Sequence, residues 1–159
     1  MQKVRQDDSC LQFVIFRVGA QNFAIEITRV KNIQRYQQPT AIPKSPAFLE
    51  GVIDVRGDLI PVVDLRKRFE ISPKPTDSKT RIIILRAVKR KVGIVVDAVQ
   101  RVIPIPLKDI KAPPSIAQSQ GADPMLAIAK HKNELYVVLD FDRILSSVQK
   151  ISLAKVKLA

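Results

Sequence analysis

Residues 51–65 read GVIDVRGDLIPVVDL, and this stretch decides the fold of the chain. Two runs of Val, Ile and Leu flank Gly57-Asp58, which predicts a β-hairpin with a two-residue type II′ turn. Such a turn places Val55 opposite Ile60, and directly opposed residues share a face of the sheet. The hairpin therefore has one apolar face, made of Ile53, Val55, Ile60 and Val62.

The opposite face of the hairpin is mixed, and Arg56 stands on it beside the predicted turn. Pro61 has no N–H to donate, so its strand is expected to be an edge strand or to be bulged there. Asp64 ends the second strand, where a carboxylate commonly caps the next helical turn. An apolar face to bury and one placed arginine favour a docking surface over a catalytic pocket.

The composition is that of a globular protein. Of the 159 residues, 46% are hydrophobic, and the apolar set is rich in Val and Ile, which favour strands. No apolar run approaches the roughly 18 residues of a membrane helix, and the N-terminal stretch alternates like a strand rather than a signal peptide. Cys10 is the only cysteine, which excludes an internal disulfide and fits a reducing compartment. We expect a cytoplasmic protein of one domain or two small ones.

The net charge of +12 raises a second class of function. A basic surface can bind nucleic acid, anionic lipid or an acidic protein. The basic residues are scattered in predicted turns, and none of the aromatic residues, 5% of the chain, is interleaved with them as a base-stacking platform requires. A small basic β-barrel that binds nucleic acid therefore stays as the alternative hypothesis, although no nucleic-acid partner is expected.

Period-two alternation and turn residues predict short strands along most of the chain. Outside the hairpin, strands are expected at about 11–18, 22–27, 31–37, 81–87, 92–96, 99–105, 125–129 and 134–139. Residues 71–80 contain two prolines and no periodicity, so they are the best candidate for a linker between two halves. A helix is predicted at 140–149 from the spacing of its apolar residues.

Two parts of the chain repeat each other. Residues 24–30, AIEITRV, match 93–99, GIVVDAV, and residues 51–65 match 127–141 in pattern rather than in identity. Two copies of a unit of short strands imply two small barrels side by side. Each half is near the lower size limit of a stable domain, so we expect the barrels to share one core.

This repeat gives the expected division of the chain. The parts are a polar N-terminal tail at 1–10, a single domain at 11–149 and a basic C-terminal tail at 150–159. Within the domain, the first barrel is expected at about 22–80 and the second at about 81–139, with 11–21 and the 140–149 helix completing the pair.

No catalytic or metal-binding constellation is present in the sequence. His131 is the only histidine, and it has neither a nucleophile nor metal ligands near it in the sequence. Cys10 has no basic neighbour that would activate a thiolate other than Arg5. The five glycines never form a phosphate-binding pattern. We expect no enzyme activity, no metal and no cofactor.

Two motifs stand out, FLEGVIDVRG at 48–57 continued by IPVVDL at 60–65, and VGIVVDAV at 92–99. They closely resemble the signature of the CheW-like chemotaxis coupling proteins, and the resemblance extends from about Leu11 to Leu145. It implies an all-β fold with short helices, in which two SH3-like five-stranded β-barrel subdomains pack around a shared hydrophobic core.

The resemblance also implies a non-enzymatic adaptor in chemosensory signal transduction. Its expected partners are a CheA-like histidine kinase, bound through the CheW-like regulatory domain of that kinase, and the cytoplasmic tip of methyl-accepting chemotaxis receptors. The protein would be cytoplasmic and recruited to membrane receptor arrays, with no insertion into the membrane.

Six positions match those that the family uses at or near its receptor-binding groove: Val30, Asn32, Gly51, Arg56, Gly93 and Val102. Four more define the hairpin and its turn: Gly57, Asp58, Pro61 and Asp64. The sequence departs from the family at Asn32, where Glu is common and can pair with the arginine matched by Arg56. Asn can accept a hydrogen bond but cannot form that ion pair, so Arg56 is expected to be freer to reach a partner.

Overall fold

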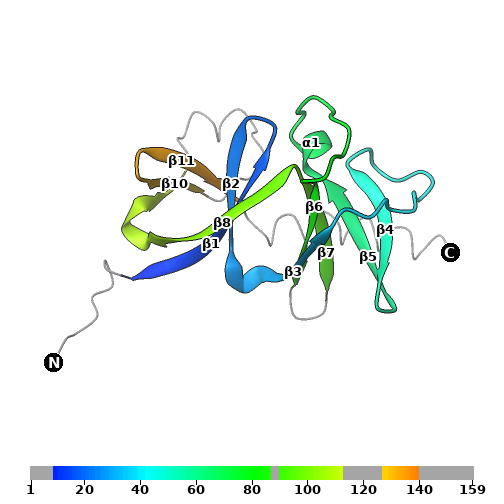
Figure 1. Cartoon of the computed structure of the whole chain (residues 1–159), viewed down its shortest axis with the longest axis horizontal. Helices are drawn as coiled ribbons and strands as arrows, with labels where there is room; N and C mark the ends of the chain where they lie inside the picture. The colour runs from blue at the N-terminus through cyan, green and yellow to red at the C-terminus, as the bar shows by residue number, and fades with distance from the viewer. Residues whose placement is uncertain (1–8, 87–89, 113–126, 140–159) are drawn as a thin grey trace.

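The computed structural model describes residues 9–86, 90–112 and 127–139 (Figure 1). The strands of this part are β1 (Cys10–Val18), β2 (Gln21–Glu26), β3 (Val30–Arg35), β4 (Leu49–Val55), β5 (Asp58–Asp64), β6 (Arg81–Arg86), β7 (Lys91–Val96), β8 (Ala98–Pro106), β9 (Ile110–Lys111), β10 (Ala127–His131) and β11 (Glu134–Val138). One short helix, α1 (Leu65–Arg68), follows β5, and single 3-10 turns occupy Ile27–Arg29 and Leu107–Asp109. The predicted helix at 140–149 and the C-terminal tail lie outside the described residues.

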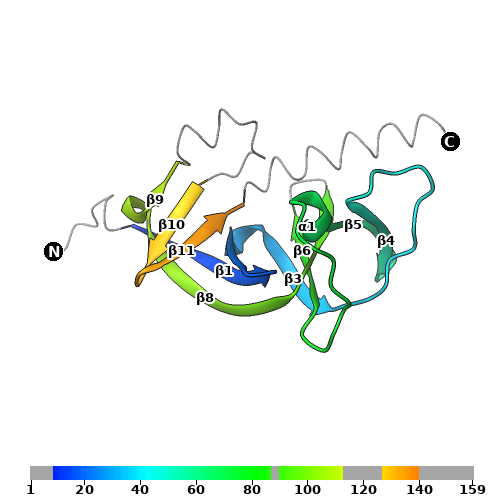
Figure 2. The same cartoon turned by 90° about the horizontal axis from the view of Figure 1, so that it is seen from above.

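The strands form two sheets that lie side by side along the long axis of the molecule (Figures 1 and 2). The six-stranded sheet has the order β8-β1-β2-β11-β10-β9, and the five-stranded sheet has the order β3-β6-β7-β5-β4. The predicted all-β class with two small subdomains is confirmed. No helix of the described residues is long and apolar enough to cross a membrane.

The hydrophobic core has three parts. The largest lies between the sheets and takes side chains from both, such as Phe16 and Phe23 from one and Leu85 and Ile94 from the other. A second cluster belongs to the six-stranded sheet and a third to the five-stranded sheet. Burial of one such side chain contributes about 1.5–3 kcal/mol, so the shared cluster is strong reason for the two sheets to stay together. The expected shared core is confirmed.

The two sheets repeat each other pair by pair. The parallel pairing Val62↔Gly93 between β5 and β7 has its counterpart in Val138↔Ala24 between β11 and β2. The offsets between these residues are those of the repeat predicted from the sequence. The same offsets relate β3 to β8, and the hairpin of β4 and β5 to the hairpin of β10 and β11. The equivalent strand pairs β3–β6 and β1–β8 each contain one register shift. The repeat is confirmed.

The sequence predicted that the two barrels divide the chain at residue 80, but the two sheets do not follow this division. The five-stranded sheet uses β3 to β7, and the six-stranded sheet combines β1 and β2 with β8 to β11. Residues 71–80 join α1 to β6 within one sheet, so they are not a linker between barrels. One repeat unit comprises β1 to β5 and the other β6 to β11. The first hairpin of each unit lies in one sheet and its later strands lie in the other, because the parallel pairs join strands of different units. Such long-range pairing leaves no local pattern in the sequence.

The turn of the central hairpin lies one residue earlier than predicted. Its two central residues are Arg56 and Gly57, with φ of 54° and 91°, as in a type I′ rather than a type II′ turn. The Asp54 carboxylate accepts a hydrogen bond from the Gly57 N–H at 2.8 Å and stabilises this position. The repeat-equivalent turn at Lys132-Asn133 also has two positive φ values, 50° and 68°.

The predicted faces of the hairpin survive this correction. Val55 pairs with Asp58 rather than with Ile60, and Ile60 pairs with Ile53. The register moves by an even number of residues, which leaves every side chain on its expected face. Arg56 is the exception, because it lies in the turn rather than in a strand.

The expected irregularity at Pro61 is also different in the structure. β5 is not an edge strand, because it lies between β4 and β7. The missing N–H is tolerated because the pairing with β7 begins only at Val62. The register shift lies in β4, between Leu49 and Gly51.

Candidate docking groove

A groove of about 430 Å³ lies at the end of the five-stranded sheet where the hairpin turns. The tip of the β4–β5 hairpin and the start of β3 are at this end (Figure 1). We call it the hairpin groove, and its lining residues are Lys31, Asn32, Val55, Arg56, Asp58, Ile60, Ile84 and Lys91. Its floor is apolar and its rim is charged, as in a surface made for a protein partner.

The charges at the rim are unbalanced. Lys91 donates a hydrogen bond to Asp58 at 2.9 Å. This bond lowers the pKa of the Asp58 carboxyl, and the charge of Lys31 adds to the effect. Arg56 is exposed, and its guanidinium makes no hydrogen bond or ion pair with any residue of the described part of the chain. The groove therefore offers cations without matching carboxylates.

Three predicted receptor-binding residues lie on or next to the groove. Asn32 and Arg56 line it, although no hydrogen bond joins their side chains in the described structure. Val30 begins β3 and packs against the shared core. Val102 lies on β8 of the other sheet, with 47% of its surface exposed, and is not among the residues that line the groove.

The two glycines of the predicted set have structural reasons to be glycine. Gly51 has φ of +142°, and a Cβ there would lie 2.0 Å from the Thr40 carbonyl oxygen. Gly93 is buried, and a Cβ would lie 3.0 Å from Ile82 Cγ2. Neither residue presents a side chain to a partner, so each shapes the sheet that carries the groove.

Of the four hairpin positions, Gly57 and Asp64 act as a turn residue and a helix cap, whereas Asp58 and Pro61 lie within β5. Gly57 takes the positive φ of the turn, and Asp58 pairs with Lys91. Asp64 caps α1 as predicted, since its carboxylate accepts from the Arg66 N–H at 2.9 Å. Sequence reasoning missed Lys91, because the residue that meets Asp58 lies on a strand 33 positions away.

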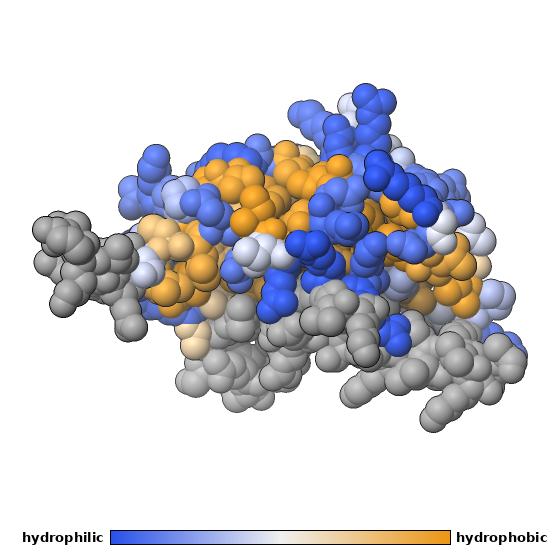
Figure 3. All heavy atoms as spheres, turned by 90° about the horizontal axis from the view of Figure 1, so that it is seen from below, coloured by the Kyte–Doolittle hydropathy of each residue, from blue (hydrophilic) through white to orange (hydrophobic). Residues whose placement is uncertain are grey.

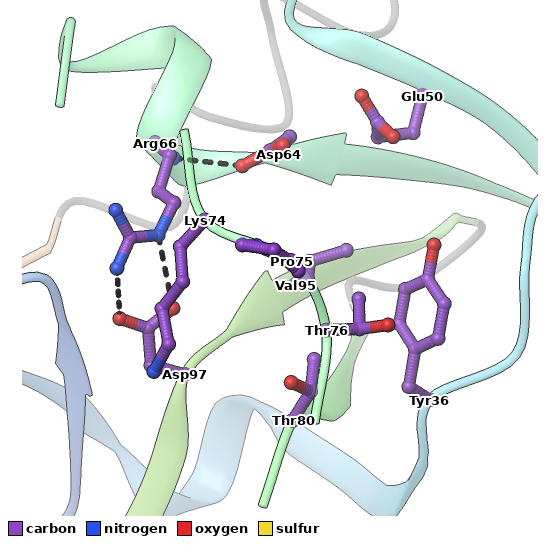
Figure 4. Close-up of a pocket in the computed structure, with 10 residues that line it drawn as sticks. All are labelled: Tyr36, Glu50, Asp64, Arg66, Lys74, Pro75, Thr76, Thr80, Val95 and Asp97. Carbon is purple, nitrogen blue, oxygen red and sulfur yellow. Dashed lines mark hydrogen bonds and ion pairs between the residues drawn. The ribbon is translucent and has the colours of Figure 1, made fainter. Parts of the chain in front are cut away.

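A second, smaller pocket lies near the junction of the sheets (Figure 4). Its volume is about 110 Å³, and its lining includes Tyr36, Glu50, Asp64, Arg66, Lys74, Pro75, Thr76, Thr80, Val95 and Asp97. In Figure 4 the Arg66 guanidinium points at the Asp97 carboxylate, and hydrogen bonds join the two groups. The same carboxylate accepts from the Gly19 N–H at 2.7 Å, so it ties the β1–β2 turn to α1.

Both carboxyls of this pocket have shifted pKa values. Burial alone would raise the pKa of Asp97, but hydrogen bonds from Arg66 and the Gly19 N–H outweigh it and hold that pKa below its ordinary value. Burial raises the pKa of Asp64, and the nearby charge of Glu50 adds to this. The hydrogen bonds of Asp97 therefore stabilise the contact between α1 and the β1–β2 turn.

The described residues offer no catalytic chemistry. They hold no group of three or more His, Cys, Asp or Glu side chains that could bind a metal ion. The Glu50 carboxylate beside Asp64 is paired with Lys67 at 2.6 Å. Among the described residues that line the hairpin groove, none is Ser, Thr, Cys, His or Tyr.

Apolar side chains reach the surface between polar ones, as Figure 3 shows for one face of the molecule. The large exposed hydrophobic residues of the described chain are Ile27, Ile33, Leu59, Val102, Leu107 and Leu135. Leu59 and Leu135 occupy equivalent positions of the two repeats, because each is the second residue of the strand that follows the hairpin turn. They are 71% and 61% exposed. Ile33 and Val102 are a second equivalent pair.

Comparison with known proteins identifies the family. The model of the CheW-like domain matches residues 12–149. A chemotaxis protein CheW of Treponema pallidum is 30% identical over 152 residues, covering 93% of this chain and 89% of that protein. A chemotaxis protein CheW of Klebsiella aerogenes is 32% identical over 136 residues, covering 86% of this chain and 82% of that protein.

A solved structure agrees with these relatives. The crystal structure of the scaffolding protein CheW from Thermoanaerobacter tengcongensis superimposes with a TM-score of 0.77 at 32% identity, covering 84% of this chain and 90% of that chain. Proteins of this family are scaffolds or adaptors of chemotaxis rather than enzymes. On its sequence, its fold and its relatives, this chain belongs to the CheW-like domain family.

Proposed function

We propose that this protein couples methyl-accepting chemoreceptors to a CheA-like histidine kinase, in the cytoplasm and at the receptor arrays of the membrane. The single observation that carries the proposal is the hairpin groove, which holds an apolar floor and an arginine without an internal partner in the described structure. A family of scaffolds needs surfaces of this kind for protein partners rather than pockets for substrates.

In this proposal the receptor tip binds at the hairpin groove. Arg56 and Asn32 contact the receptor, and Val30, Gly51 and Gly93 shape the sheet beneath them. Val102 is a separate contact on the other sheet. Support comes from the exposure of Arg56 and from its lack of a partner among the described residues.

The kinase contact uses exposed apolar side chains at one barrel end. Leu59 and Leu135 are the most exposed large hydrophobic residues of the described chain, and each lies at the turn end of a barrel. A leucine of this kind can anchor an interface when a partner covers it. Their equivalence in the repeat also makes each the matched control for the other.

The receptor half of the proposal is tested with Arg56→Ala. Ala and Arg have a similar cost in a left-handed conformation, so the free energy of unfolding is expected to change by no more than about 0.5 kcal/mol. Binding to a chemoreceptor cytoplasmic fragment and thermal unfolding are measured on the same sample. Weaker receptor binding at unchanged stability supports the proposal, and unchanged binding contradicts it.

The kinase half is tested with Leu59→Asp and Leu135→Asp. Binding to the regulatory domain of a CheA-like kinase is measured by calorimetry, with the Arg56→Ala protein as a control that keeps both leucines. One of the two changes should abolish kinase binding while receptor binding remains. No binding of the unchanged protein at micromolar concentration would refute the adaptor role.

A further inference from the structure

The two barrel ends differ, although the strands that build them are equivalent. At the end of the six-stranded sheet, Arg101 donates to the Tyr136 hydroxyl at 3.0 Å, and that hydroxyl donates to Glu134 at 2.6 Å. Arg101 and Glu134 are also 3.8 Å apart as an ion pair. Tyr136 is 1% exposed, whereas the Arg101 and Glu134 side chains are 51% and 56% exposed, so the ion pair lies over a buried tyrosine at this end.

In the five-stranded sheet, the three equivalent positions hold Asn32, Asp58 and Ile60. Their side chains are shorter than those of Arg101, Glu134 and Tyr136, and no ion pair joins Asn32 to Asp58. The difference leaves the cavity of about 430 Å³, within the size range of pockets that hold small ligands or side chains. One repeat therefore has an ion pair over a tyrosine at these positions, and the other has a groove.

The open end is cationic as well as apolar. Lys31, Arg56 and Lys91 line it together with one carboxylate, Asp58, and that carboxylate is already bonded to Lys91 at 2.9 Å. Three positive charges against one negative charge leave an excess that the described residues do not neutralise. Ile60 beneath them is 2% exposed, which gives the groove a closed apolar floor.

We infer that the hairpin groove binds a segment of the partner that carries a carboxylate side chain next to an apolar one. The apolar side chain packs against Val55, which is only partly buried, and the carboxylate pairs with the Arg56 guanidinium, whose fixed fork suits bidentate binding. The partner thus supplies a carboxylate to an arginine, as Glu134 does to Arg101 at the end of the other barrel. That the segment comes from a chemoreceptor rests on the proposed function, whereas its chemistry rests on the groove alone.

Charge reversal tests the inference, and the repeat supplies its control. Arg56 and Lys132 hold the same position in equivalent turns, with φ of 54° and 50°, and both are exposed. Arg56→Glu and Lys132→Glu therefore change the net charge equally in the same backbone conformation. For a chemoreceptor cytoplasmic fragment, we expect Arg56→Glu to weaken binding at least tenfold and Lys132→Glu to change it less than twofold. Changing one fragment carboxylate to Lys should restore binding to the Arg56→Glu protein.

Equal losses in the two variants would overturn the inference, since they would reflect only net charge. No loss in Arg56→Glu would overturn it as well. Oligonucleotides and anionic vesicles serve as alternative probes. If one of them binds the wild-type protein, and if Arg56→Glu weakens that binding while Lys132→Glu does not, the groove belongs to another class of partner.

A second measurement does not depend on any receptor. Twelve-residue peptides are selected from a random display library on the wild-type protein, with counter-selection on Arg56→Glu. Enrichment of sequences with Asp or Glu beside Leu, Ile, Val, Met or Phe is expected. Enrichment without acidic residues, or no enrichment, overturns the inference even if receptors bind. If acidic peptides are enriched but the protein binds no receptor fragment, the proposed function is refuted and the inference about the groove stands.

Discussion

Replacement of Arg56 by Asn should stabilise the fold while it removes binding. Arg56 has φ of 54°, and a left-handed conformation costs an ordinary L-residue about 1–2 kcal/mol. Asn tolerates this conformation far better and is favoured in type I′ turns. The change sacrifices no internal contact of the guanidinium in the described structure, and the hydrogen bond from Gly57 to Asp54 at 2.8 Å is retained. We expect a gain of roughly 0.5 kcal/mol, or about 1–2 °C in Tm.

Loss of the guanidinium should nevertheless weaken receptor binding. A hydrogen bond to a charged group contributes about 1.5–3 kcal/mol, which corresponds to a loss of roughly 10- to 100-fold in affinity. Scanning calorimetry gives Tm, and titration calorimetry with the receptor fragment gives Kd. Lys132→Asn is the control, because it makes the same change in the equivalent turn and should raise Tm without affecting binding. A fall in Tm of several degrees, or an unchanged Kd, would refute the reasoning.

Three further predictions concern the fold. Cleavage near Pro75 should not release stable halves, because each fragment holds strands of both sheets and neither holds a whole sheet; separated fragments that unfold cooperatively would contradict this. Asp97→Asn should lower stability by about 1–3 kcal/mol at pH 7. Since the folded pKa of Asp97 is depressed, the wild-type contribution is fully present above the unfolded pKa of about 4 and is lost as the pH falls through the lower folded pKa, so the difference between the urea midpoints of the two proteins should shrink steadily on acidification below about pH 4. Gly51→Ala should cost about 3 kcal/mol or more, because of its φ and the contact with Thr40; a Tm close to wild type would exclude this strain.

The repeat was the most predictable feature of this fold. Matching 24–30 with 93–99 and 51–65 with 127–141 gave offsets that hold for the pairing Val62↔Gly93 and its counterpart. The exchange of strands between the units was not predictable, because period-two patterns report the faces of a strand and not its neighbours. A parallel pair between β5 and β7 depends on residues about 30 positions apart.

The turn was misplaced for a local reason. Propensity argues against an arginine with positive φ, so the glycine was taken as the first turn residue, although the structure uses it as the second. At the candidate site, Arg56 and Asn32 line the same groove as Lys31 and Lys91, which sequence reasoning did not single out; that any of them binds a receptor stays a prediction. Their contribution depends on the end of a barrel being open, which only the tertiary structure shows.

The exchange of strands between the repeats also sets an order of assembly during synthesis. The five-stranded sheet needs only residues 30–96, whereas β2 must wait for its parallel neighbour β11, which ends at Val138. At about 5–20 residues per second, the roughly 110 intervening residues take on the order of 5–20 s to synthesise. During this time Phe13 lacks the β10 and β11 side chains of its cluster, whereas Phe16 and Phe23 can pack against the five-stranded sheet as soon as residue 96 is made. The β1–β2 hairpin is therefore among the first strands to be made and among the last to gain all of its neighbours in the sheet.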